Sequence, residues 1–196
     1  MSKTLIGCGL AAVGAILLVA LMVGGIYNSL VGLQEGVDAA WAQVENVYQR
    51  RADLIPNLVA TVKGAAEFEQ ETLQNVVEAR AKVGQTTIEG APTPAQMEAF
   101  QANQDALSSA LSRLLVVVER YPDLKAVEAF RDLQVQLEGT ENRIAVERNR
   151  YNEVARDYNT ARRRFPAVLI AGYLGFTDKG YFEARPGSDE PPQVEF

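Results

Sequence analysis

The sequence predicts an all-α protein in which a single N-terminal transmembrane helix continues into an antiparallel, up-and-down four-helix bundle. Two observations lead to this class. The chain of 196 residues has 19 basic and 25 acidic side chains, yet residues 4–34 carry no charge at all. Beyond them, apolar side chains recur at alternating steps of three and four residues, which is the period of one helix face. We therefore expect a membrane anchor joined to a helical bundle over residues 34–165.

The anchor is the most apolar part of the chain. Residues 5–27 read LIGCGLAAVGAILLVALMVGGIY, which is 23 uncharged and mostly apolar residues. A helix needs about 20 residues to cross the roughly 30 Å hydrocarbon core of a bilayer. The apolar region of a cleaved signal peptide is shorter, about 7–15 residues. We therefore expect a retained transmembrane helix over residues 5–33, after a short flank of residues 1–4.

The charges beside the anchor predict its orientation. Lys3 and the amino terminus lie on one side, whereas the first charged residues on the other side are acidic: Glu35, Asp38 and Glu45. Positive charge close to a span stays on the cytoplasmic side. The sequence therefore predicts a bacterial inner (cytoplasmic) membrane protein with a cytoplasmic N-terminus and its helical domain outside, in the periplasm.

The first helix beyond the membrane continues the anchor. Its seam begins inside the uncharged segment and comprises Leu30, Leu33, Val37, Trp41, Val44, Tyr48, Arg51, Ile55, Leu58 and Val62. Pro56 lies within this seam and has no N–H to donate, so it predicts a kink or a local break. We expect the anchor and the domain to form one rod.

Three more helices are predicted, with short connections between them. A short apolar pattern covers residues 67–83, and after a Gly- and Pro-rich loop Thr93 can cap a helix whose first residue is Pro94. The third seam comprises Met97, Phe100, Gln104, Leu107, Leu111, Leu114, Val118 and Tyr121. The fourth comprises Ala126, Phe130, Leu133, Leu137, Thr140, Ile144, Glu147, Tyr151, Val154, Tyr158, Ala161 and Phe165, and Pro166 ends it. Heptad-patterned helices with short connections are typical of antiparallel packing.

Two charged residues interrupt the seams. Arg51 lies 16 residues after Glu35, and Glu147 lies 18 residues before Phe165 on a helix that runs the other way. At similar heights in the bundle, Arg51 and Glu147 are predicted to form an interhelical ion pair. Such a pair is better attested as a determinant of register than as a source of stability.

The end of the last helix carries a candidate contact surface. Arg162, Arg163 and Arg164 return to the membrane end, where they could meet anionic headgroups, and residues 166–176 carry no charge. The predicted membrane or subunit contact comprises Arg162, Arg163, Arg164, Phe165, Leu169, Ile170, Tyr173, Leu174 and Phe176. The alternatives are a solvated helix face with ion pairs at i,i+4, and a cap folded over the open end of the bundle.

The last segment, residues 166–196, joins this apolar stretch to an extended acidic tail. It ends in Val194, Glu195 and Phe196, an apolar-x-apolar carboxyl terminus of the kind that PDZ domains bind by strand addition. Envelope proteases carry such domains, so these three residues form a candidate partner-binding tail. The alternative is a tail that packs on its own or a neighbouring bundle.

The composition excludes several classes of protein. The chain has no His and one Cys, which excludes His-activated nucleophiles, His-ligated zinc and Cys-cluster zinc sites. Its net charge of −6 argues against binding to nucleic acid. We therefore expect no enzyme, no catalytic residue, no cofactor and no metal.

Four segments carry a resemblance to a known family. They are RRADLIPNLVATVKG at 50–64, TLQNVVEARAKV at 72–83, YPDLKA at 121–126 and GTENRIAVERNRYNEVARDYNTARRRFPAVLIAGYLGF at 139–176. In this order after an N-terminal span, the chain resembles the LemA family over nearly all its length. The resemblance implies a four-helix up-and-down domain and a membrane protein with magnetosome-membrane relatives and HtpX-type membrane metalloproteases as neighbours. It supplies no active-site motif.

These features predict a structural protein. We expect a single-pass helical scaffold that self-associates on the membrane surface, with a role in membrane organisation or envelope stress and quality control. The alternative is an adaptor for a membrane protease or sensor. The predicted partners are the lipid bilayer, further copies of the chain and a membrane protease.

Overall fold

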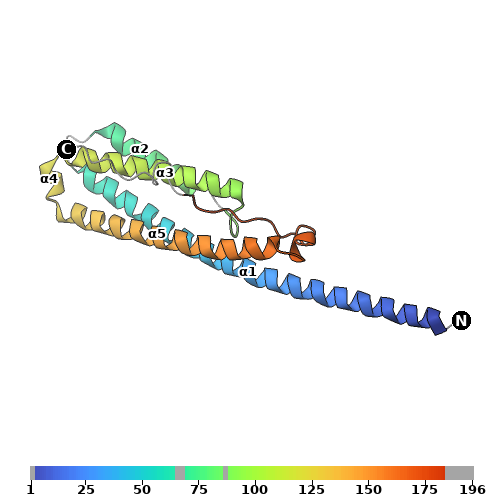
Figure 1. The fold of residues 1–196 in the computed structure, drawn as a ribbon. Coiled ribbons are helices and arrows are strands. Elements are labelled where there is room, and N and C mark those ends of the chain that lie inside the picture. Colours follow the sequence, from blue (N-terminus) through green and yellow to red (C-terminus); the bar gives the residue numbers. More distant parts are fainter. Residues whose placement is uncertain (1–2, 65–68, 86–87, 184–196) are drawn as a thin grey trace, which may run out of the picture.

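The computed structural model describes residues 3–64, 69–85 and 88–183, and its secondary structure there is helical (Figure 1). The elements are α1 (Lys3–Lys63), α2 (Gln70–Gly84), α3 (Pro94–Val118), α4 (Pro122–Lys125), α5 (Glu128–Arg163) and the 3-10 helix η1 (Ala167–Leu169). This confirms the all-α class. The described part of the chain contains one helix that is long and apolar enough to cross a membrane, and it is N-terminal as predicted.

Helix α1 is a single element of 61 residues, which corresponds to a rod of about 90 Å. Its most apolar window has a mean hydropathy of 2.4, and none of that window is buried inside the structure. Figure 1 shows this end of α1 projecting alone, away from the other helices. The other end of the same helix lies in the core, so the anchor and the domain share one backbone.

The sequence predicted a kink or a local break at Pro56. In the structure α1 continues through Pro56 and ends at Lys63. Proline at 56 cannot donate to the carbonyl of Ala52 one turn earlier. Arg80 on α2 donates its Nε–H to this carbonyl at 2.9 Å. The neighbouring helix therefore supplies the hydrogen bond that Pro56 removes.

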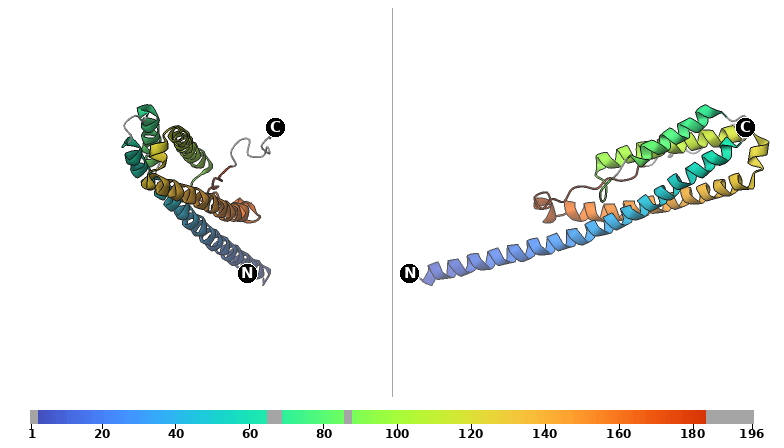
Figure 2. Two further views of the ribbon diagram at one scale, coloured as in Figure 1. Left: turned by 90° about the vertical axis from the view of Figure 1, so that its left-hand side faces the viewer. Right: turned by 180° about the vertical axis from the view of Figure 1, so that it is seen from behind.

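The four long helices alternate in direction and pack chiefly as two pairs, α1 with α5 and α2 with α3 (Figures 1 and 2). Trp41 contacts Tyr151, and ten residues further along α1 Arg51 contacts Glu141, so α1 and α5 run antiparallel. Helix α3 meets α1 through the edge of the Phe100 ring, which packs on Trp41 and on Tyr48.

The core has two clusters, one at each end of the helical domain. The cluster nearer the apolar end of α1 is rich in aromatic side chains, with Trp41 packed on Phe100, Tyr151 and Phe182. The distal cluster is mostly aliphatic and includes Ile55, Leu58, Leu73, Val76, Leu107, Leu114 and Leu137. All seam residues predicted on α1 from Val37 to Val62 are buried.

The helix ends differ from the predicted ends by a few residues. Thr93 forms a capping box with Gln96, and Pro94 occupies the first turn of α3. Helix α2 begins at Gln70 where residue 67 was predicted, and α5 ends at Arg163, two residues before Phe165.

The aromatic cluster extends toward the apolar end of α1. Leu30 is buried in it, and Ile26 packs against it, although both lie in the range 5–33 predicted to be the span. Residues 5–25 remain below this core, which is about 31 Å of helix. That length still matches the hydrocarbon core of a bilayer.

Candidate functional site: the strap at the membrane end

Beyond α5 the chain reverses and runs back over the domain. Gly175, with φ of 85°, adopts a left-handed conformation at the reversal, which glycine tolerates without steric cost. Residues 176–183 then follow as an extended segment, which we call the strap, between α3 and α5 (Figure 1). The strap is the part of the domain that sequence reasoning had treated only as the start of a tail.

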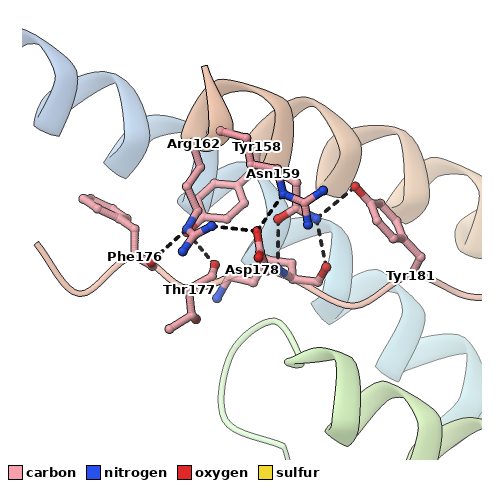
Figure 3. Close-up of polar contacts among 9 residues, drawn as sticks. Tyr158, Asn159, Arg162, Phe176, Thr177, Asp178 and Tyr181 are labelled. Carbon is pink, nitrogen blue, oxygen red and sulfur yellow. Dashed lines mark hydrogen bonds and ion pairs between the residues drawn. The ribbon is translucent and has the colours of Figure 1, made fainter. Parts of the chain in front are cut away.

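Two asparagines of α5 hold the strap through its backbone. Asn159 accepts from the N–H of Lys179 and donates to its carbonyl, both at 2.9 Å (Figure 3). Asn152 makes the same two bonds, also at 2.9 Å, with Phe182. Each side-chain amide thus bonds both the N–H and the carbonyl of one strap residue, as a neighbouring β-strand would do. The buried backbone groups of these residues therefore have hydrogen-bond partners.

A tyrosine precedes each of these asparagines and also binds the strap. Tyr151 donates its hydroxyl to the carbonyl of Gly180 at 3.1 Å, and Tyr158 donates to that of Thr177 at 2.9 Å. Burial raises the pKa of both phenols, which keeps them protonated and able to donate. These tyrosines act as structural donors.

The spacing of these contacts is matched between helix and strap. The Tyr-Asn dipeptide recurs after seven residues of α5, which is about 10.5 Å of helix. Its partners on the strap are three residues apart for both the tyrosines and the asparagines, which is about 10 Å of extended chain. The heptad repeat of α5 therefore sets the register of the strap.

Two of the three predicted contact arginines bind the strap. Arg162 donates its Nε–H to the carbonyl of Phe176 at 2.9 Å and lies 2.8 Å from Asp178 (Figure 3). Arg163 lies 3.2 Å from the same carboxylate. Arg164 caps the end of α5 and its side chain is exposed. Asp178 therefore neutralises part of the positive charge of Arg162 and Arg163 within the chain itself.

The other side of the strap is fastened to α3 and the loop before it. The N–H of Gly180 donates to the carbonyl of Pro92 at 2.9 Å, and Gln101 exchanges two bonds of 3.2 Å with the backbone of Glu183. Phe182 is buried, with its ring stacked on that of Trp41. Helices α3 and α5 make little direct backbone contact with each other. The strap therefore joins them.

The predicted ion pair has a different acidic partner. Arg51 donates to Glu141 at 2.7 Å, to Ser108 at 3.0 Å and to Gln104. Glu147 lies 4.0 Å from Arg150 on its own helix. The acidic partner is six residues from the predicted one because the C-terminal end of α5 lies closer to the N-terminus of α1 than the prediction assumed.

The uncharged turn after α5 divides its side chains between the core and the surface. Phe165, Leu169 and Tyr173 are 80%, 62% and 94% exposed, whereas Ile170 and Leu174 are half-buried. Phe176 is buried, and its ring contacts that of Tyr27 at 5.7 Å. The structure thus contains both a cap on the bundle end and an exposed apolar face.

Two other predictions concern chemistry and the tail. Among the described residues, no group of three or more acidic or cysteine side chains could hold a metal ion. The candidate partner-binding residues Val194, Glu195 and Phe196 lie outside the described residues, and their role stays a prediction.

The fold defines an all-helical protein whose N-terminal helix has the length and composition of a membrane span. Residues 40–196 match the sequence model of the LemA family, and the chain belongs to this family. The magnetosome protein MamQ 2 of Paramagnetospirillum magneticum is 28% identical over 184 residues, covering 84% of this chain and 67% of the relative. MamQ of Magnetospirillum gryphiswaldense is 27% identical over 190 residues, covering 86% and 70%. Protein LemA of Metamycoplasma hominis is 23% identical over 160 residues, covering 82% and 70%.

Sequence reasoning placed Tyr151 and Tyr158 in the seam but missed what the adjacent asparagines do. A signal was present: the dipeptide Tyr-Asn occurs at 151–152 and again at 158–159. The two asparagines are one heptad apart beside the seam, so they lie on the same face of α5. Both bind the backbone of the strap.

Proposed function

We propose that this protein is a single-pass, membrane-anchored scaffold whose antiparallel four-helix bundle self-associates on the membrane surface. Its role would be membrane organisation or envelope quality control. The observation that carries the proposal is the continuity of α1, which is exposed and apolar at one end and buried in the core at the other. A domain built on its own anchor is held at a fixed height and tilt, as a scaffold requires.

The strap supports this role mechanically. It is held to α5 by asparagine, tyrosine and arginine side chains and to α3 by Gln101. A force applied to the domain would therefore be transmitted to α1 by helices that the strap holds together. Relatives that carry the name magnetosome protein favour the membrane-organisation role.

Self-association is supported by an open groove between α3 and α5, which lies beyond the end of the strap toward α4. The groove has a volume of about 480 Å³, and three leucines line it, Leu111, Leu115 and Leu137. The rest of its lining is polar: Ser108, Ser112, Gln134, Glu138, Glu141 and Asn142. Protein contacts commonly combine apolar and polar surface in this way. We propose that further copies of the chain meet here.

Cysteine cross-linking in native membranes tests the contact. Cys8 is the single cysteine of the chain and is replaced by Ser, after which Ser112→Cys or Asn142→Cys is introduced at the groove. A short bifunctional reagent is expected to give a product of twice the chain mass from either site. Val77→Cys on α2, where valine is 47% exposed, is the matched control and should stay monomeric. Equal cross-linking at all three sites, or none, would contradict the proposal.

The adaptor role for a membrane protease or sensor is the second proposal. It predicts a chain that is monomeric in the membrane and captured with a stoichiometric partner. The cross-linking experiment therefore separates the two roles.

A further inference from the structure

We propose that the turn over residues 165–174, which we call the apolar turn, docks on the bilayer that holds α1 and forms a second contact with lipid. The proposal rests on the proposed membrane placement of α1. It commits the exposed face of the turn to one occupant, the surface of a phospholipid bilayer.

The apolar turn has an inner and an outer face. Ala167 and Ala171, 8% and 1% exposed, face the core, and the N–H of Ala171 donates to the carbonyl of Ala167 at 2.8 Å. The outer face carries large apolar side chains: Phe165, Val168, Leu169 and Tyr173. The small alanine side chains fill the space next to the core, and the large apolar side chains are exposed to the surroundings. Contiguous exposed apolar surface of this kind marks an interaction site.

The height of the apolar turn on α1 identifies the partner. Phe176 follows the turn and packs on Tyr27, and Leu30 shares a core cluster with Ala167 and Ala171. A span of about 20 residues that starts near residue 5 ends just before Tyr27. Tyrosine and tryptophan collect at this headgroup level. The turn therefore lies where the bilayer surface must be if α1 crosses it.

The figures agree with this placement. In Figures 1 and 2 the turn is the part of the domain that reaches furthest along α1 toward the N-terminus. Arg164 is exposed at its edge and can meet lipid phosphates while the apolar side chains enter the interface. Arg163 is exposed beside it, although it also pairs with Asp178 at 3.2 Å. An amphipathic edge of this kind lies in the membrane interface and not across the membrane.

Fluorescence in vesicles tests the docking. In the full chain with Cys8→Ser, Tyr173→Cys is labelled with an environment-sensitive NBD group and reconstituted in phosphatidylcholine–phosphatidylglycerol vesicles. Tyrosine 173 is 94% exposed, so the label should fit without disturbing the core. Val135→Cys, 68% exposed and near the start of α5, at the end of that helix opposite to the turn, is the matched control. Leu169→Cys repeats the test at a second site on the turn.

The expected result is blue-shifted emission at 173 and 169 that spin-labelled lipids quench several-fold more strongly than emission at 135. Two results would overturn the proposal. One is quenching by aqueous iodide that is equal at the turn and at 135. The other is a blue shift without lipid quenching that disappears when the protein is diluted in lipid, because this would mean that a second copy covers the turn. Emission of Trp41, the single tryptophan, verifies that each variant is folded.

Failure of this inference can be distinguished from failure of the proposed function. If α1 does not span the bilayer, the chain will not float with vesicles after alkaline extraction, and the proposed function fails with it. If the chain floats and cross-links at the groove while position 173 stays in water, the docking alone is wrong.

Discussion

Arg51 of α1 donates a hydrogen bond of 2.7 Å to Glu141 of α5, from a side chain that is 2% exposed to one that is 46% exposed. The pair lies between the aromatic and the aliphatic halves of the core. Gln104 and Ser108 of α3 accept from the same guanidinium. One buried cation therefore connects three helices and fixes their relative heights.

Removing this cation is expected to cost more than removing its acidic partner. Arg51→Ala should lower the free energy of unfolding by about 3 kcal/mol, because it leaves Gln104 buried without its donor. Glu141→Gln should cost about 1 kcal/mol, since an amide oxygen can still accept the bond. Denaturant titration of the full chain in detergent, followed by Trp41 emission, measures both. Glu147→Gln is the control, and a larger loss there than at Glu141 would support the register predicted from helix heights.

Arg80 and Pro56 are expected to be coupled. Arg80→Met alone should destabilise the protein by about 1–2 kcal/mol, because the carbonyl of Ala52 then loses its donor. In a Pro56→Ala background the N–H of residue 56 can bond that carbonyl, so the same change should cost about 1 kcal/mol less. A double-mutant cycle by denaturant unfolding measures this coupling. Additive losses would show that Arg80 does not replace the missing bond.

Gly180 is expected to be essential to the strap. A Cβ at this position would lie 2.6 Å from the Cβ of Met97 and 3.0 Å from the Cα of Pro94, so Gly180→Ala must push the strap off α3. We expect a loss of about 1–3 kcal/mol and faster hydrogen exchange over residues 176–183.

Gly139 provides the matched control for this change. It lies inside α5 with open space where a Cβ would lie, so Gly139→Ala should stabilise the protein by about 0.5–1 kcal/mol. Equal effects at the two glycines would mean that the strap does not contact α3 closely.

Stability should fall in alkaline solution. Burial raises the pKa of Tyr48, Tyr151 and Tyr158 above their ordinary value of 10.0. Above pH 10 the unfolded chain loses these protons while the folded chain keeps them, so the folded state is progressively disfavoured as the pH rises. The stabilisation is complete below pH 10, and melting temperature against pH measures its loss.

Tyr158→Phe isolates one of these contributions. It should lower stability at neutral pH by about 1 kcal/mol, through loss of the bond to Thr177, and make the alkaline decline shallower. Tyr173→Phe, at a position that is 94% exposed, is the control for stability at neutral pH and should have little effect. An unchanged alkaline slope in Tyr158→Phe would contradict the assignment.

The fold class and the buried face of α1 followed from the sequence because both depend on periodic apolar side chains. Each seam position from Val37 to Val62 is buried for that reason. The partner of Arg51 did not follow, because periodicity identifies a face but not the height of one helix against another. The bonds of Arg51 to Glu141 and Gln104, together with Trp41 against Tyr151, set that height.

The strap was the larger omission. Its residues have no period of their own, and its hydrogen bonds come from side chains 20 and 30 residues earlier on α5 and 82 residues earlier on α3. Only the repeated Tyr-Asn dipeptide pointed to it. The three arginines were predicted from charge alone, and charge could not show that Asp178 binds two of them.

The molar mass of the full chain, purified in mild detergent and measured by light scattering with the detergent subtracted, tests the central claim most directly. A self-associating scaffold predicts a single species whose mass is two or more times that of the 21.4 kDa chain. Ser112→Arg at the groove should shift it toward the monomer, whereas Val77→Arg should not. A uniform monomer of the unaltered chain across the concentration range would contradict the scaffold and favour the adaptor.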